Sequence, residues 1–295
     1  MMNILPKESN SFNIIGYSKW FSDSKLVADS TDMQSEEEED YNDTIQIAAC
    51  NNSEDIPVIY EKKIFGEYMR QENIHQIKNN ANLDHQNSIS ELDRDMVINW
   101  LLLTSISESL SHHTIALAVK IFDYVIQVIP LDRSELKIYA ATSMLMASKL
   151  EEEDSTVICE RLCSLLVIPT KNLLVKTELK ILHILDYDLR FITPFMYIEH
   201  FIAHHTSPRN NDLILKLKQL SKAITYASIL SYSSTQFTSY EIAKNIFELC
   251  LYYTHIHHYR PDNECCRHIL NALSTAFDET GSLRSIFPYL VPIFN

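Results

Sequence analysis

Glycine is the residue that this sequence lacks most clearly. The 295 residues contain only three, Gly16, Gly66 and Gly281, and no two of them are neighbours. Loops that hold a phosphate or a dinucleotide need clustered glycines, because only glycine lets a phosphate approach the backbone closely. The tight turns of β-hairpins also favour glycine. The sequence therefore argues against a nucleotide-hydrolysing enzyme, a dinucleotide-binding fold and an all-β protein.

Long apolar runs and cysteine patterns are missing as well. No apolar run approaches the ~20 residues that a membrane helix needs, so we predict no membrane partner. Six cysteines in a chain of this length do not form a disulfide framework, and no segment resembles a signal peptide. We therefore predict an intracellular protein with reduced cysteines, in the nucleus, the cytoplasm or both, without a clear nuclear localisation signal.

Positive charge is scarce, above all near the N-terminus. The net charge is −14, and residues 1–60 hold 12 acids against 3 bases, including the acidic run that ends at Asp40. Like charges at this density repel one another and offer no apolar stripe, so we predict that residues 1–56 form a disordered acidic tail. Because an acidic chain repels phosphate backbones, we predict no nucleic-acid partner.

Hydrophobic periodicity begins after the tail. Apolar side chains spaced three and four apart predict an N-terminal helix near Tyr60, within a segment of helix and linker at 57–90. Two sets of helices follow. The first is expected around Met96–Thr104, His113–Ile126, Arg133–Glu151, Thr156–Leu165 and Thr170–Leu185. The second is expected around Pro194–Ala203, Asn211–Tyr226, Ala227–Ser231, Ser239–Thr254, Asp262–Phe277 and Leu283. The fold class is therefore all-α, with two consecutive five-helix bundles at 91–192 and 193–295.

The helix expected at Arg133–Glu151 has an unusual composition. It combines small residues such as Ala140, Ala141 and Ala147 with larger apolar ones on its other faces. A helix that is apolar or small nearly all round is surrounded by other helices. We therefore expect it to be the central rod of the first bundle.

An ordered series of motifs resembles the cyclin family. The segments that match the first, second, third and fifth helices of a cyclin box are Leu92–Leu101, Ala116–Asp123, Leu136–Glu152 and Glu178–Leu189. The most specific piece is Ala147-Ser148-Lys149 with its two following glutamates, and Tyr60–Glu72 looks like the N-terminal helix of A- and B-type cyclins. The resemblance is good from Tyr60 to Pro194, thins over 195–290, and is absent from the first 56 residues. It implies that both bundles have the cyclin fold, the second being the more divergent.

The family resemblance implies a regulatory function without catalysis. Cyclins are regulatory subunits, so the chain is expected to bind and activate a cyclin-dependent serine/threonine kinase in cell-cycle control, with no catalytic residue and no cofactor. The implied kinase contacts are Tyr60, Ile64, Tyr68, Lys149, Glu178, Leu182, Tyr187 and Leu189.

Four charges lie within apolar helices. Arg94, Asp123, Lys149 and Glu178 each fall on a different predicted helix, flanked by core residues. Buried charges without partners are strongly unfavourable, so these side chains must pair or reach a partner protein. The resemblance implies that Arg94 pairs with Asp123 inside the bundle. It implies that Lys149 and Glu178 lie near the surface, where they hydrogen-bond to main-chain groups at one end of the kinase's regulatory helix.

A substrate-docking groove is expected to be degenerate. In many cell-cycle cyclins a surface groove accepts an Arg-x-Leu peptide, and here the matching residues are Asp93, Met96, Val97, Trp100, Leu136 and Lys137. Asp93 replaces a methionine, Lys137 replaces a glutamine, and the positions of the acids that hold the peptide's arginine carry Leu103 and Ser107. Asp93 could compensate only in part. We therefore expect ordinary Arg-x-Leu docking to be lost.

Two alternatives stay open at this point. A cyclin-fold transcription adaptor of the transcription-factor-IIB or retinoblastoma type would lack a kinase. Lys149 with Glu178, the N-terminal helix and the acidic charge argue against it. The other alternative, an enzyme, would require turnover by the pure chain, which we do not expect.

Histidine and cysteine gather near the C-terminus, at His255, His257, His258, Cys265, Cys266 and His268. Their spacing does not match the paired ligands of a zinc site, so no metal is predicted. His112 and His113, at a helix start, are predicted to be exposed.

Overall fold

The computed structural model describes most of the chain after the acidic tail. The described residues are 55–74, 83, 86, 88–166, 171–206, 210–279 and 281–294, and for 55–62 and 157 this covers the backbone only. Residues 1–54 of the predicted tail lie outside this part. The chain divides into two compact units, Met1–Lys63 and Ile64–Asn295. Nearly all described side chains belong to the second unit.

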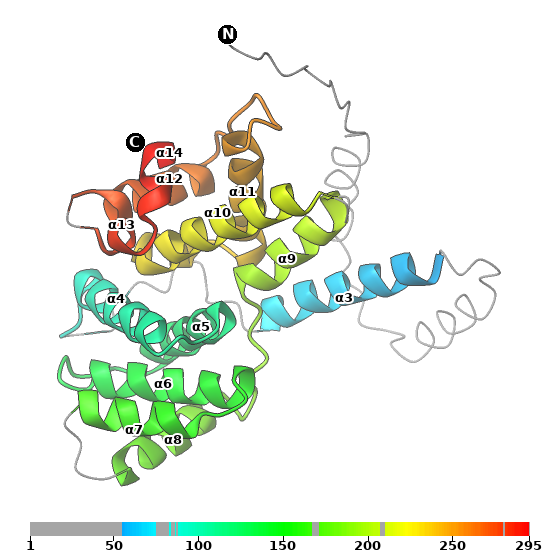
Figure 1. The fold of residues 1–295 in the computed structure, drawn as a ribbon. Helices are drawn as coiled ribbons and strands as arrows, with labels where there is room; N and C mark the ends of the chain where they lie inside the picture. The colour runs from blue at the N-terminus through cyan, green and yellow to red at the C-terminus, as the bar shows by residue number, and fades with distance from the viewer. Residues whose placement is uncertain are drawn as a thin grey trace. The chain divides into compact units, whose positions relative to one another are not determined.

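The second unit is built from helices, and no strand occurs in the described ranges (Figure 1). The all-α prediction is therefore confirmed. None of the helices in this part of the chain combines the length and the apolar character needed to cross a bilayer.

The first set of helices surrounds α6. It comprises α4 (Glu91–Ser107), α5 (His112–Val128), α6 (Leu136–Glu151), α7 (Thr156–Leu165) and α8 (Asn172–Ile184). Helix α6 contacts all four of the others, and every residue from Tyr139 to Ser148 is buried. The small side chains of α6 let its neighbours approach closely, which places it at the centre of the set.

Local hydrogen bonds fix where two of these helices begin. Ser90 and Asp93 form a capping box at the start of α4, which satisfies backbone donors that a helix N-terminus leaves unpaired. Helix α6 begins at Leu136 rather than at Arg133. The preceding residues form a turn instead, in which the Glu135 amide donates to the Asp132 carbonyl at 2.8 Å.

The second set of helices surrounds α10 (Figure 1). It comprises α9 (Pro194–His205), α10 (Asn211–Leu230), the 3-10 helix η3 (Tyr232–Gln236), α11 (Ser239–Tyr253), α12 (Glu264–Phe277), α13 (Ser282–Ile286), the 3-10 helix η4 (Pro288–Leu290) and α14 (Val291–Phe294). The prediction of two helices meeting at Tyr226 and Ala227 was wrong. Both residues are buried inside one continuous α10, and neither is a helix breaker.

The two sets pack against each other within one compact unit. Helix α4 contacts α10 and η3, and α5 contacts α9 and α10. The division of the chain into domains at residue 193 stays a prediction.

Helix α3 (Asp55–Ile74) adds to the second set through its C-terminal half. The Phe65 ring meets the rings of Tyr197 and Tyr240, each at a centroid distance of 5.7 Å. The buried Glu72 carboxylate accepts hydrogen bonds from the Tyr197 hydroxyl at 3.1 Å and from the backbone amide of Ser239, the first residue of α11. This carboxylate therefore serves as an N-terminal cap for α11, where the helix dipole favours negative charge.

Candidate functional site

A surface ion pair links the C-terminal end of α6 to the middle of α8. The Lys149 ammonium lies 2.5 Å from a Glu178 carboxylate oxygen, and the exposed fractions of the two side chains are 45% and 16%. The structure thus brings together the two charges that the resemblance assigned to a kinase. The buried part of α6 ends at Ser148, and the next residue, Lys149, lies at the surface.

Large apolar side chains flank this ion pair. Leu150 follows Lys149 and is 55% exposed, whereas Leu179 follows Glu178 and is 50% exposed. Leu173 and Val175, at the start of α8, are also exposed, and Leu182 is partly buried. Exposed apolar residues are normal one at a time, but a group of them marks an interaction surface.

Tyr187 extends this surface beyond the end of α8. Its side chain is 60% exposed, and its hydroxyl lies 3.3 Å from His183 Nε2. Asp186 and Tyr187 both adopt left-handed backbone conformations, with φ of 47° and 61°. This conformation is strained for residues other than glycine. Leu189, two residues on, is partly buried.

The predicted contacts on α3 have different surroundings. Ile64 is 47% exposed, whereas the Tyr68 ring packs edge-on against Tyr197 of α9 at 5.7 Å. Burial and the Glu199 carboxylate raise the pKa of Tyr68. The side chain of Tyr60 lies outside the described residues.

The exposed Glu67 carboxylate lies on the same helix as Ile64 and Tyr68. Its pKa is lowered to about 2 by hydrogen bonds from Arg70 and Gln71, and the charge of Arg190 contributes.

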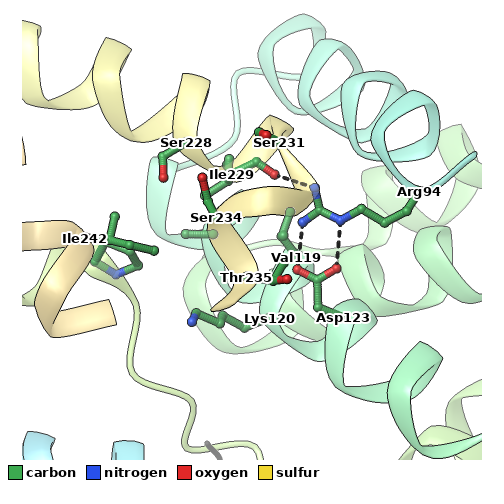
Figure 2. Close-up of a pocket in the computed structure, with 12 residues that line it drawn as sticks. Arg94, Val119, Lys120, Asp123, Ser228, Ile229, Ser231, Ser234, Thr235 and Ile242 are labelled. Atoms are coloured by element: carbon green, nitrogen blue, oxygen red, sulfur yellow. Dashed lines mark hydrogen bonds and ion pairs between the residues drawn. The ribbon is translucent and has the colours of Figure 1, made fainter. Parts of the chain in front are cut away.

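Arg94 and Asp123 meet in the buried interior (Figure 2). Arg94 Nε and Nη2 donate to the two Asp123 oxygens at 2.9 and 2.7 Å, and the residues are only 1% and 3% exposed. Burial disfavours the guanidinium charge, but Asp123 outweighs this effect and raises the pKa of Arg94. The paired geometry suits the planar guanidinium, which matches two carboxylate oxygens at once.

Sequence reasoning missed the other partners of Arg94. Its Nη1 donates to the carbonyl oxygens of Ile229 and Leu230 at 2.9 and 3.3 Å, and to Asp95 at 3.0 Å. These carbonyls belong to the last turn of α10, where a cation is favourable. Arg94 therefore joins the first set of helices to the second. Backbone carbonyls leave no trace in a sequence pattern, so no motif could have revealed this contact.

A small pocket opens beside this pair (Figure 2). Lys120 lines it, and burial lowers the pKa of this lysine. The buried hydroxyls of Ser228 and Ser234 also line it and have no hydrogen-bond partner. The pocket lies between the two helical sets and is lined by residues of both, an arrangement that the sequence did not predict.

The residues of the predicted docking groove are only partly accessible. Val97 and Leu136 are buried, Met96 is 50% exposed, and the Lys137 ammonium lies 6.0 Å from the centroid of the Trp100 ring. A cation at this distance interacts favourably with an indole face. Lys137 therefore lies where a cationic peptide would approach Trp100.

Asp93 is not available to replace the missing acids. It is 7% exposed, accepts hydrogen bonds from Ser90 within the capping box, and forms an ion pair with Arg133 at 2.5 Å. The Ser90 hydrogen bonds lower its pKa. Leu103 and Ser107 occupy the two positions at which acids would hold the peptide's arginine, and both are exposed and uncharged.

Two successive helical sets, joined by a buried arginine, form an all-α scaffold that carries a surface ion pair between α6 and α8. The family model described as the cyclin N-terminal domain matches residues 63–190. Cyclin-B2-2 from Oryza sativa subsp. indica is 27% identical over 198 residues, which cover 65% of this chain and 44% of that protein. Cyclin-A2 from Xenopus laevis is 27% identical over 177 residues, which cover 60% of this chain and 41% of that protein. Residues 63–190 of the chain therefore match a cyclin N-terminal domain, and the curated relatives of this chain are cyclins.

Further comparisons agree with the fold. The G1/S-specific cyclin-D1 of Xenopus laevis is 33% identical over 114 residues, or 37% of this chain and 38% of that protein. The alignments thus span less than half of each of these three relatives. The crystal structure of a viral cyclin from herpesvirus saimiri matches with a TM-score of 0.58 at 16% identity, and covers 78% of this chain and 94% of the viral one. This last likeness supports the cyclin fold.

Proposed function

We propose that this protein binds a cyclin-dependent serine/threonine kinase and activates it in cell-cycle control. The observation that carries the proposal is the Lys149–Glu178 ion pair, 2.5 Å long, at a surface with exposed Leu150 and Leu179. Relatives named as mitotic and G1/S cyclins support the cell-cycle role. In this proposal the protein is a regulatory subunit and carries out no catalysis of its own.

The ion pair suits the end of a partner helix. Lys149 offers donors and Glu178 offers acceptors, so together they can bind unpaired main-chain groups at a helix terminus. The apolar side chains beside them supply the hydrophobic contact area that a surface ion pair alone does not provide. Tyr187 adds a rigid aromatic side chain, a type enriched in interfaces.

Activation then follows from selective binding. An inactive kinase holds its regulatory helix displaced, so that the glutamate of that helix cannot pair with the lysine that positions ATP. A rigid helical surface that contacts the helix in its active position binds the active state more tightly. The protein therefore shifts the kinase population toward that state.

The first test replaces the two charges of the ion pair. We expect Lys149→Ala and Glu178→Ala each to weaken kinase binding by about 10- to 100-fold, because each loses charge-assisted hydrogen bonds worth ~1.5–3 kcal/mol. The kinase is first identified by co-purification and mass spectrometry. Affinity and kinase activity are then measured for each variant.

The matched control is Arg267→Ala on α12, which breaks an exposed ion pair with Asp262, two residues before that helix. It should leave kinase binding unchanged, and circular dichroism should show that all three variants keep their helices. If both Lys149 and Glu178 variants activated the kinase like the wild type, the assigned surface would be wrong. Retention of the protein on DNA, without any co-purifying kinase, would favour the transcription-adaptor alternative.

A second test concerns substrate docking. We expect no measurable binding of an Arg-x-Leu peptide, because Leu103 and Ser107 cannot hold its arginine and Lys137 repels it. The triple variant Leu103→Glu, Ser107→Glu and Lys137→Gln should gain binding. Fluorescence anisotropy of a labelled peptide measures both.

Comparing the unmodified chain with the triple variant makes this test specific to the groove. A further Trp100→Ala change in the triple variant should abolish the gained binding, because Trp100 is the apolar part of the groove that persists. Tight peptide binding by the unmodified chain, lost on Trp100→Ala, would contradict the prediction.

A further inference from the structure

Three side chains of metal-ligand type meet where the first turn of α5 faces α9. His112 Nε2 and His113 Nε2 lie 3.2 and 3.1 Å from the same oxygen of Glu199. The ligand atoms of all three residues lie within 4.8 Å of one another. Within the described part of the chain, this is the only group of three histidine, cysteine or carboxylate side chains that approach so closely.

The spacing of these atoms fits a zinc ion. Zinc binds histidine nitrogen and carboxylate oxygen at about 2.0–2.2 Å in tetrahedral geometry, so neighbouring ligand atoms lie about 3.3 Å apart. The two observed nitrogen–oxygen distances, 3.2 and 3.1 Å, are close to this value. The two histidine nitrogens lie within 4.8 Å of each other, and they would approach each other on binding one ion.

Ring packing holds the two imidazoles in position, and their partial exposure lets an ion reach them from solvent. The rings of His112 and His113 lie 4.3 Å apart, and the Phe195 ring packs edge-on against both. The side chains of the two histidines are 32% and 25% exposed, and that of Glu199 is 49% exposed. The expectation that both histidines are simply exposed was therefore wrong, since each is partly covered.

We propose that His112, His113 and Glu199 form a Zn²⁺ site with a fourth position open to water or an external ligand. Imidazole is a preferred ligand of zinc, and three protein ligands with one open position are an established zinc arrangement. The ion would link α5 of the first set of helices to α9 of the second. The prediction of no metal rested on the histidines and cysteines near the C-terminus. It did not consider this group, because His113 and Glu199 are 86 residues apart and give no recognisable spacing.

The test is calorimetric titration of Zn²⁺ into the full chain after treatment with a chelator. We expect one zinc per protein, bound at least about tenfold more weakly by His113→Ala and Glu199→Gln, since loss of even an outer-sphere partner costs about 10- to 100-fold in affinity. Cobalt(II) should give the intense visible absorption of a four-coordinate site in the wild type and lose it in both variants. The Glu199→Gln change preserves side-chain volume and should keep the fold.

The matched control is His204→Ala, which removes an exposed histidine from α9, the helix that carries Glu199. It should bind zinc like the wild type. Zinc should also raise the melting temperature of the wild type and of this control, but not of the two ligand variants. Absence of zinc binding would overturn the proposal. So would equal binding by wild type, His113→Ala and Glu199→Gln, because zinc would then be held elsewhere, for example by the histidines and cysteines between His255 and His268.

Discussion

Replacing Arg94 by alanine is expected to lower the free energy of unfolding by about 3–5 kcal/mol. The change leaves the Asp123 carboxylate buried without its cation, and it removes a donor from the Ile229 and Leu230 carbonyls at the end of α10. For a chain of this size the loss corresponds to a decrease in melting temperature of roughly 6–20 °C. Thermal unfolding followed by circular dichroism measures it.

A double variant separates the ion pair from simple loss of volume. Arg94→Met with Asp123→Leu should recover much of the stability that either single change removes, because apolar residues of similar size leave no unpaired charge. The control Arg267→Ala, at an exposed ion pair, should barely change the melting temperature. An unchanged melting curve for Arg94→Ala would mean that the side chain is solvated rather than buried.

Replacing Glu72 by alanine is expected to be the second most damaging change, lowering the free energy of unfolding by about 3 kcal/mol. The carboxylate accepts from the amides of Ser239 and Tyr240, the first two residues of α11, and from the Tyr197 hydroxyl. Removing it leaves buried donors without acceptors, and it removes a negative charge from a helix N-terminus. Urea unfolding measures the loss, which should appear as a lower midpoint with an unchanged slope.

Two further variants identify the contribution of charge. Glu72→Gln keeps one acceptor oxygen but places an amide NH2, which cannot accept, where the other carboxylate oxygen accepts. It should therefore lower the free energy of unfolding by less than Glu72→Ala but by more than the helix-dipole part alone. Glu67→Gln removes an exposed carboxylate from the same helix, beside Arg70, and should leave the urea midpoint unchanged. If Glu72→Ala matched Glu67→Gln, the C-terminal half of α3 would not be held by this carboxylate.

Much of the fold could be predicted because the spacing of apolar residues reflects which helix faces are buried. The periodicity of α5 and the small side chains of α6 specify two buried helices whose bounds match the structure within a few residues. The break between Tyr226 and Ala227 was predicted wrongly, because a run of small and polar residues resembles a helix end unless neighbouring helices bury it. Tertiary packing determined that part of α10.

The candidate site, too, could be predicted only in part. Lys149 and Glu178 could be placed on separate helices from periodicity, but their pairing came from the cyclin resemblance alone. The contacts of Arg94 with α10, of Glu72 with α11 and of His113 with Glu199 join residues 86 or more positions apart. Two of these three involve backbone groups, which every residue carries, so no sequence pattern distinguishes the partners.

The position of Arg94 and Glu72 also bears on where a working fragment of this protein can be cut. The family match ends at residue 190, which makes the segment from α3 to α8 look self-sufficient. Yet the carbonyls that Arg94 binds, and the amides that Glu72 caps, all lie beyond residue 228. A truncation at 190 would leave Arg94 with Asp95 and Asp123 but without the two carbonyls, and it would remove Tyr197, Ser239 and Tyr240 from the Glu72 carboxylate. The unit that sequence families define is therefore shorter than the unit that folds cooperatively.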